Sequence, residues 1–461
     1  MKKGKAEAYM EFCFFLLLLT VYMHGIGKLF GPIRFPDEFG YWSHGARLLG
    51  YDWNEVSGIH PYYSFGYGML MAPLLKWCSN PVVLYRIAVS INFIMIVWCY
   101  VLLKKILVIL FHAPAYPFMT LFSGLAILYS SFMVYAQTTL PEILLALLYL
   151  LLIASVLMFF QKPSAYYMGA MAAISAGLYF VHMRTLGIGM ALWLVLVWEA
   201  VINKDIRAHV LTGALAYGIL IIAGMVYKNN YIDEIYGVSG GSLAALNDFS
   251  GQIEKLGKLT NIKGMADFIC SLGGKLFYLG SATGGLFYWG IMSLHSMTAC
   301  SIRHKMIAAR FVLLSALFTL SIVSLFMIDT PRVDGVIYGR YSEILLPIFI
   351  GTGLTAMVRS PSMWKVSFGI ICFQSVMMYL VNWKISSSGA YGIYRHSIPA
   401  VAYALELSSN RVFAFTKNVY LGGVFLGLTM AGVLWIVRQR ERFWYLAFLW
   451  AVIQWGLGMD V

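Results

Sequence analysis

Residues 34–45 read RFPDEFGYWSHG, and residues 58–61, GIHP, close the same segment of the chain. This segment follows the first long apolar run and places two adjacent carboxylates, Asp37 and Glu38, among aromatic side chains. Only 20 of the 461 residues are acidic, so a carboxylate pair directly after an apolar segment requires a reason. We interpret the rest of the chain as a scaffold that holds this segment over a cleft accessible to lipid.

The composition is that of a polytopic membrane protein. Hydrophobic residues make up 60% of the chain, charged residues 11%, and the mean hydropathy is +0.76. The net charge of +13 comes from small basic clusters between apolar segments, as expected for cytoplasmic connections, so a nucleic-acid partner is not expected. The six cysteines form no Cys-x-x-Cys pair, which argues against a disulfide framework or a zinc site.

The apolar segments predict an all-α fold. A membrane-spanning helix needs about 20 apolar residues, and the chain offers about thirteen such segments. Together they form one membrane-embedded domain over residues 1–461. The predicted spans are 12–31, 82–103, 115–135, 141–160, 164–182, 185–201, 208–227, 276–297, 307–328, 343–358, 363–382, 412–437 and 443–459.

The basic residues predict the orientation. They recur in every second connection, which places the N-terminus in the cytoplasm and, with an odd number of spans, the C-terminus outside. The long connections 32–81, 228–275, 329–342 and 383–411 then lie on the outer side, with short amphipathic helices expected in them, the first over Tyr41–Leu49. The absence of an Asn-x-Ser/Thr acceptor favours a bacterial plasma membrane.

Asp37 and Glu38 are the predicted catalytic residues. Neighbouring side chains diverge, so we expect one carboxylate to point into a cleft and the other toward its support. A carboxylate in a cleft suits general-base catalysis, in which it takes a proton from an acceptor hydroxyl. The alternative is an interfacial pair that simply faces water. The sequence leaves open which of the two is the base.

Two arginines on the same predicted side suit an anionic ligand. Arg340 and Tyr341 lie in YGRYSEILLP, residues 338–347, and Arg184 lies in the short turn HMRTLG, residues 182–187. A guanidinium binds phosphate through two parallel hydrogen bonds, and a tyrosine adds a hydroxyl donor. The alternative is that these residues anchor the chain to lipid headgroups.

Four further polar side chains are candidates for binding sugar or acceptor: His60, Tyr62, Glu142 and Glu343. Two of them, Glu142 and His60, have a simpler explanation. Glu142 ends QTTLPE, residues 137–142, where a carboxylate stabilises a helix N-terminus. A lone histidine such as His60 is more often structural than a ligand. Because all these candidate polar residues fall on the predicted outer side of the membrane, the pattern favours a functional site there.

The chain resembles the polyprenyl-phosphate-sugar-dependent glycosyltransferases of the GT-C superfamily, such as protein O-mannosyltransferases and lipid A aminoarabinose transferases. The Asp-Glu segment, the QTTLPE turn, the HMRTLG turn and the Gly-Arg-Tyr segment stand in the expected order over roughly residues 12–350. The resemblance implies that Asp37 is the catalytic base and that Arg184 and Arg340 hold the carrier phosphate. The chain departs from the eukaryotic mannosyltransferases in having no large folded domain in its middle outer loop, which argues against a protein acceptor.

The sequence thus predicts an inverting glycosyltransferase that moves a sugar from a polyprenyl-phosphate donor to an envelope glycan, lipid or protein on the outer face. No cofactor is implied with certainty, and a divalent metal ion held by Glu38, Glu142 and His60 stays open. Two alternatives remain: a transporter of a lipid-linked saccharide, and a polysaccharide polymerase or ligase that uses a diphosphate-linked donor. A transporter is expected to place polar groups near the bilayer midplane and to show repeated halves, and neither is visible.

Overall fold

The computed structural model describes residues 2–33, 37–111, 116–237, 253–328, 332–388, 392–408 and 412–439, and the single residues 244, 330 and 456. Regular structure in these ranges is entirely helical, as the sequence predicts. The predicted span 443–459, the outward C-terminus and residues 34–36 of the Asp-Glu segment lie outside the described residues.

Eight described helices are long and apolar enough to cross a membrane, and a bent pair brings the number to nine. The chain is therefore an integral membrane protein. The pair is α6 (Tyr116–Ile127) with α7 (Ser130–Ala136), bent by 58°. The eight are α1 (Lys2–Met23), α5 (Pro81–Phe111), α8 (Glu142–Gln161), α10 (Leu186–Ile202), α11 (Arg207–Tyr236), α16 (Arg303–Phe326), α19 (Met363–Ser388) and α21 (Val412–Gln439).

Three other predicted spans coincide with shorter or interrupted helices. These are α9 (Ala165–Val181), α18 (Leu346–Arg359), and the pair α14 (Ile262–Ala282) and α15 (Leu286–Met297). The expectation of one continuous helix over 276–297 is wrong, because Gly284 and Gly285 take positive φ angles of 56° and 83°. A left-handed residue ends an α-helix, and glycine adopts this conformation without a steric penalty.

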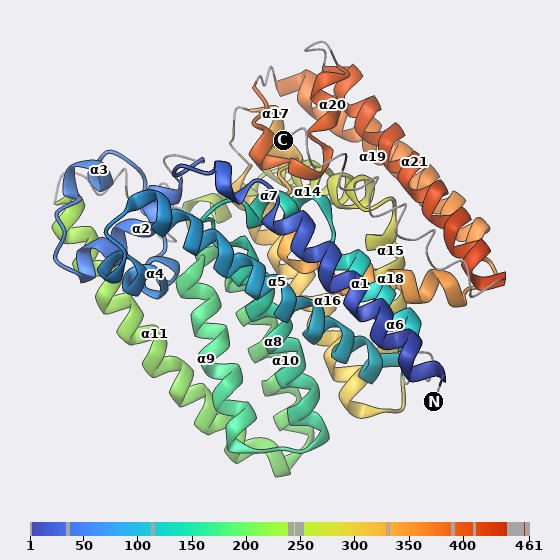
Figure 1. Ribbon diagram of the computed structural model, residues 1–461, viewed down its shortest axis with the longest axis horizontal. Coiled ribbons are helices and arrows are strands. Elements are labelled where there is room, and N and C mark those ends of the chain that lie inside the picture. The colour runs from blue at the N-terminus through green and yellow to red at the C-terminus, as the bar shows by residue number, and fades with distance from the viewer. Residues whose placement is uncertain are drawn as a thin grey trace.

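The first long connection, which the sequence places on the outer side, folds into three short helices: α2 (Asp37–Leu48), α3 (Asn54–Gly58) and α4 (Gly66–Trp77). The predicted helix at Tyr41–Leu49 is present and begins one turn earlier, where Asp37 and Glu38 complement the positive end of the helix dipole. The three helices gather at one end of the bundle, beside the ends of α9 and α11 (Figure 1).

The three other predicted long connections are also partly helical, and region 329–342 holds α17 (Val333–Val336). Region 228–275 holds the end of α11 and the start of α14, and region 383–411 holds the end of α19 and the short helix α20 (Tyr403–Glu406). In Figure 1, α7, α17 (Val333–Val336) and α20 lie at the same end of the molecule as α2. The chain therefore brings its short helices and turns together at one end of the long helices.

Candidate active site

A cavity of about 450 Å³ opens at this end of the bundle. Four separate stretches of chain contribute to its wall: the first long connection, the turn between α9 and α10, the end of α16 with the region after it, and the segment before α20. Its lining residues are Asp37, Tyr41, Tyr62, Tyr63, Ser64, His182, Met183, Arg184, Phe326, Met327, Thr330, Arg332, Tyr338, Arg340, Tyr341 and His396. The structure thus places five of the nine predicted site residues on one cavity wall.

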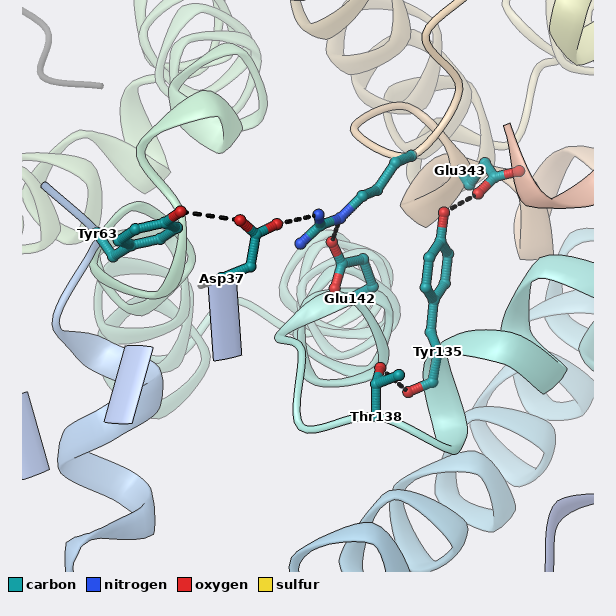
Figure 2. Close-up of polar contacts among 7 residues, drawn as sticks. Asp37, Tyr63, Tyr135, Thr138, Glu142 and Glu343 are labelled. Carbon is teal, nitrogen blue, oxygen red and sulfur yellow. Dashed lines mark hydrogen bonds and ion pairs between the residues drawn. The ribbon is translucent and has the colours of Figure 1, made fainter. Parts of the chain in front are cut away.

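Asp37 reaches the cavity from the first turn of α2. Its Oδ1 accepts a hydrogen bond from the Tyr63 hydroxyl at 2.8 Å, and its Oδ2 accepts one from Arg340 Nη1 at 2.6 Å (Figure 2). The side chain keeps 27% of its surface exposed, so an incoming molecule can still reach the carboxylate. Asp37 therefore has a fixed orientation and an open face.

The surroundings of Asp37 keep it ionised. Burial by itself raises the pKa of this carboxyl, but the charge of Arg340 and the hydrogen bonds from Arg340 and Tyr63 outweigh burial, with a smaller contribution from His396. The net result is a pKa below the ordinary value of 3.8. At neutral pH Asp37 is a carboxylate that can accept a proton.

Arg340 is the centre of a buried ion cluster. Its Nε donates to Glu142 Oε1 from the first turn of α8, and its Nη1 donates to Asp37. Only 1% of its side chain is exposed, and its backbone N–H donates to the carbonyl of Ser397 at 3.3 Å. The guanidinium thereby joins α2 to α8, and the backbone N–H of the same residue joins them to the segment before α20.

Glu38 points away from the cavity. Its carboxylate accepts hydrogen bonds from the Ile33 N–H at 2.7 Å, the Tyr85 hydroxyl at 2.8 Å and the Thr139 N–H at 2.6 Å. The side chain is fully buried. The two neighbouring carboxylates diverge as the sequence suggested, and the cavity-facing one is Asp37.

Arg184 and Tyr341 form a second part of the cavity wall. The Arg184 guanidinium carbon lies 3.7 Å from the ring centre of Phe326 and 3.5 Å from that of Tyr341, so it is held between two aromatic faces. Tyr341 also stacks on Tyr338, with ring centres 4.5 Å apart. Burial and the nearby charges of Arg184 and Arg340 lower the pKa of His182, which leaves this neighbour neutral.

Of the four predicted sugar or acceptor ligands, only Tyr62 lines the cavity. Glu142 is the partner of Arg340. His60 borders a separate small void beside α3 and α11, and its carbonyl accepts a hydrogen bond from the Tyr236 hydroxyl. Glu343 is fully buried, and the hydroxyl groups of Tyr129, Ser131, Tyr135 and Tyr278 all donate to its carboxylate. Direct contact of Glu343 with a ligand in this cavity is therefore not supported.

Several cavity residues received no role from sequence reasoning. Tyr63 lies within the first predicted outer loop, and its hydrogen bond to Asp37 depends on how α2 and α4 are placed. His396 comes from the last third of the chain, where no motif marks it. Its segment is brought in by contacts with the Arg340 loop: Gly339 N–H donates to Ser397 O at 3.0 Å, and Tyr394 N–H donates to Asp334 at 3.2 Å.

No group of three or more histidine, cysteine or acidic side chains within the described ranges is arranged to hold a metal ion. The proposed set of Glu38, Glu142 and His60 does not meet, since Glu38 and Glu142 are each tied to different partners and His60 lies in another void. The charged groups at the cavity itself are a carboxylate and arginines.

Comparison with known proteins identifies the fold. No protein-family model and no curated protein sequence matches the chain. Two solved structures of ArnT from Cupriavidus metallidurans do match, with 97% of this chain and 75% of ArnT covered. The apo form gives a TM-score of 0.50 at 13% identity, and the form bound to undecaprenyl phosphate gives 0.51 at 14%. ArnT is a lipid A aminoarabinose transferase with a GT-C fold, so the predicted fold resemblance is confirmed.

Proposed function

We propose that this protein is an inverting glycosyltransferase that takes a sugar from a polyprenyl-phosphate carrier and transfers it to a hydroxyl of a cell-envelope acceptor on the outer face of the membrane. The observation that carries the proposal is the ionised carboxylate of Asp37 in an open cavity that Arg184, Arg332 and Arg340 also line. The likeness to ArnT, one form of which was solved with undecaprenyl phosphate, supports a lipid phosphate as the carrier.

In this mechanism Asp37 removes the proton from the acceptor hydroxyl as its oxygen attacks the anomeric carbon of the sugar. Attack occurs on the face opposite the phosphate, so the configuration inverts. A positioned general base contributes typically 10²–10⁴ in rate. The Tyr63 hydroxyl and Arg340 fix the orientation of the carboxylate before the acceptor arrives.

The leaving phosphate requires positive charge. We assign this role first to Arg184, whose guanidinium lies against the Tyr341 ring at the cavity wall, and then to Arg340. Aromatic faces on both sides hold the Arg184 guanidinium plane without occupying its hydrogen-bonding edge. Positive groups that are already in place where charge develops lower the barrier without reorganisation. Tyr62 and His396 lie on the same wall and are proposed to contact the sugar or the acceptor.

The test uses purified protein in detergent with a short-chain polyprenyl-phosphate sugar carrying a radiolabel in the sugar, and an envelope lipid extract as acceptor. We expect label to move from the carrier to the extract with wild-type protein and not with Asp37→Asn. Asp52→Asn is the matched control, since Asp52 is an exposed aspartate of the same connection. Binding of the carrier without transfer by wild type, together with carrier movement across liposomes, would instead support a transporter.

A further inference from the structure

Arg340 contacts its two carboxylates through different nitrogen atoms. Nε holds Glu142, and Nη1 holds Asp37. In the described part of the chain, no side chain or carbonyl accepts a hydrogen bond from Nη2 of Arg340, and this residue lines the cavity. A phosphate oxygen can therefore approach Arg340 before either carboxylate contact is broken.

The cluster carries more negative than positive charge. Asp37 and Glu142 together supply two carboxylates to one guanidinium. Glu142 has 2% of its side chain exposed, and its Oε2 is buried without a hydrogen-bond partner among the described residues. A buried carboxylate is costly unless it remains beside a cation. Glu142 is therefore the fixed partner of Arg340, and Asp37 is the partner that can be released.

We propose that Arg340 follows the negative charge during transfer: it pairs with Asp37 before the reaction and with the carrier phosphate after it, while Glu142 holds its Nε throughout. This inference rests on the proposed glycosyltransferase function. It makes Glu142 a positioning residue, not a ligand of sugar or acceptor. It also means that donor binding, by drawing Arg340 toward the phosphate, makes Asp37 a stronger base.

The charges balance through the step. The acceptor O–H bond breaks and its proton goes to Asp37, which becomes neutral. The acceptor oxygen forms a bond to the anomeric carbon, and the bond from that carbon to the phosphate oxygen breaks with its electron pair on the phosphate. The phosphodiester, with one negative charge, becomes a monoester with two. The charge that Asp37 loses is the charge that the phosphate gains, so a cation between them needs to move little.

Carrier affinity gives a test that does not depend on turnover. Asp37 competes with the phosphate for Arg340, so Asp37→Asn should bind an unsugared short-chain polyprenyl phosphate about tenfold more tightly than wild type. Arg340→Gln should bind it more weakly. In the double variant the gain from Asp37→Asn should disappear, because the shared cation is absent. A gain of the same size in both backgrounds would reflect only the loss of a negative charge and would overturn the proposal.

The role of Glu142 is tested by a pH profile. The groups that act on Asp37 from other elements are Arg340, Tyr63, His396 and Glu142. In Glu142→Gln, Arg340 has only Asp37 to pair with, so the acceptor kcat/KM at saturating donor should fall about a hundredfold and its acidic limb should move to lower pH. Glu142→Asp keeps the charge and should restore both the rate and the limb toward wild type.

Loss of activity in Glu142→Gln without movement of the acidic limb would show a merely structural role and overturn this part of the inference. If Glu142→Gln does not fold, the pH profile of Glu142→Asp is compared with that of wild type instead. The carrier affinities of Asp37→Asn, Arg340→Gln and the double variant then still test the proposal. The outcomes also separate the two proposals. If wild type transfers sugar but Asp37→Asn binds the carrier no more tightly, the proposed exchange of Arg340 between Asp37 and the phosphate is wrong, and the glycosyltransferase function stands. If wild type neither binds the carrier nor transfers sugar, both proposals are wrong.

Discussion

Arg340 and Glu343 are three residues apart in the chain, but they belong to two different carboxylate clusters. The first contains Asp37, Glu142 and Arg340 and borders the cavity. The second contains Glu343, which accepts hydrogen bonds from four hydroxyl groups and does not border it. Both clusters contain a buried glutamate, but only the first also contains a cation and an accessible carboxylate.

The difference shows that burial of a carboxylate does not by itself indicate catalysis. Glu343 fastens the Arg340 turn to α7 through Tyr135 and to α14 through Tyr278. Its network is complete and encloses its charge, as expected for a group that fixes backbone position. Asp37 keeps one face open, and its charge is shared with the guanidinium of Arg340, a residue that lines the cavity. The following substitutions separate these roles.

Asp37→Asn should have the largest effect on activity. The amide keeps the size of the side chain but cannot take the acceptor proton, so turnover should fall by about 10²–10⁴. Sugar transfer at saturating donor and acceptor measures the loss, and polyprenyl-phosphate binding shows that the cavity is intact. Glu38→Gln is the informative neighbour. Wild-type turnover in Asp37→Asn with loss in Glu38→Gln would move the base to Glu38, and activity in both would argue against a glycosyltransferase.

Arg184→Ala should have the next largest effect. Loss of a cation that meets developing phosphate charge should lower donor kcat/KM by about 10²–10³, with both a higher donor KM and a lower kcat. Arg47→Ala is the matched control, because Arg47 lies on α2 and pairs with Glu234 outside the cavity. An exposed ion pair of this kind contributes little. Donor kinetics that are unchanged in a folded Arg184→Ala variant would leave Arg340 and Arg332 as the candidates for the phosphate contact.

Much of this arrangement could be predicted from the sequence, and the reasons for the remainder are physical. Local rules suffice for the spanning helices and for the divergence of Asp37 and Glu38, since both depend on residues close in the chain. The Arg340–Glu142 contact joins residues 198 positions apart, and the Arg340–Asp37 contact joins residues 303 apart. Such pairings depend on helix packing. The break at Gly284 and Gly285 is also a packing feature, because α21 passes directly beside it.

The roles of Glu142, His60 and Glu343 show the same limit. Each is a polar residue on the predicted outer side, and the sequence alone gives no means to distinguish a ligand contact from an internal support. The structure separates them by their surroundings. Glu142 pairs with an arginine, His60 borders a separate small void, and Glu343 accepts hydrogen bonds from a cluster of hydroxyl groups. His396 shows the converse, since its place on the cavity wall follows from backbone hydrogen bonds between the 397 and 339–340 segments.

Glu343→Gln should reduce stability more than catalysis. The amide replaces an acceptor-only group in a set of four hydroxyl donors, which leaves mismatched buried partners at a cost of about 1–3 kcal/mol in the free energy of unfolding. Thermal unfolding in detergent measures the cost, and transfer assays below the unfolding temperature should show less than about a tenfold loss of rate. Tyr135→Phe, which removes one donor, should cost less. A stable Glu343→Gln protein without activity would place Glu343 in the catalytic machinery.

The smallest expected effect is the dependence of stability on acid. The folded-state pKa of Asp37 lies below its ordinary value of 3.8, so the carboxylate stabilises the folded protein at pH values above 3.8. That contribution is lost as pH falls through the folded-state pKa, because protonation removes the charge that Arg340 and Tyr63 bind. Between pH 7 and about pH 5 the unfolding temperature of wild type and Asp37→Asn should therefore differ by a constant amount. Below about pH 4 the two curves should converge, while those of Asp52→Asn and wild type should stay parallel. Convergence that begins near neutral pH would mean that the folded protein holds Asp37 protonated, and such a carboxyl could not serve as the base before the donor binds.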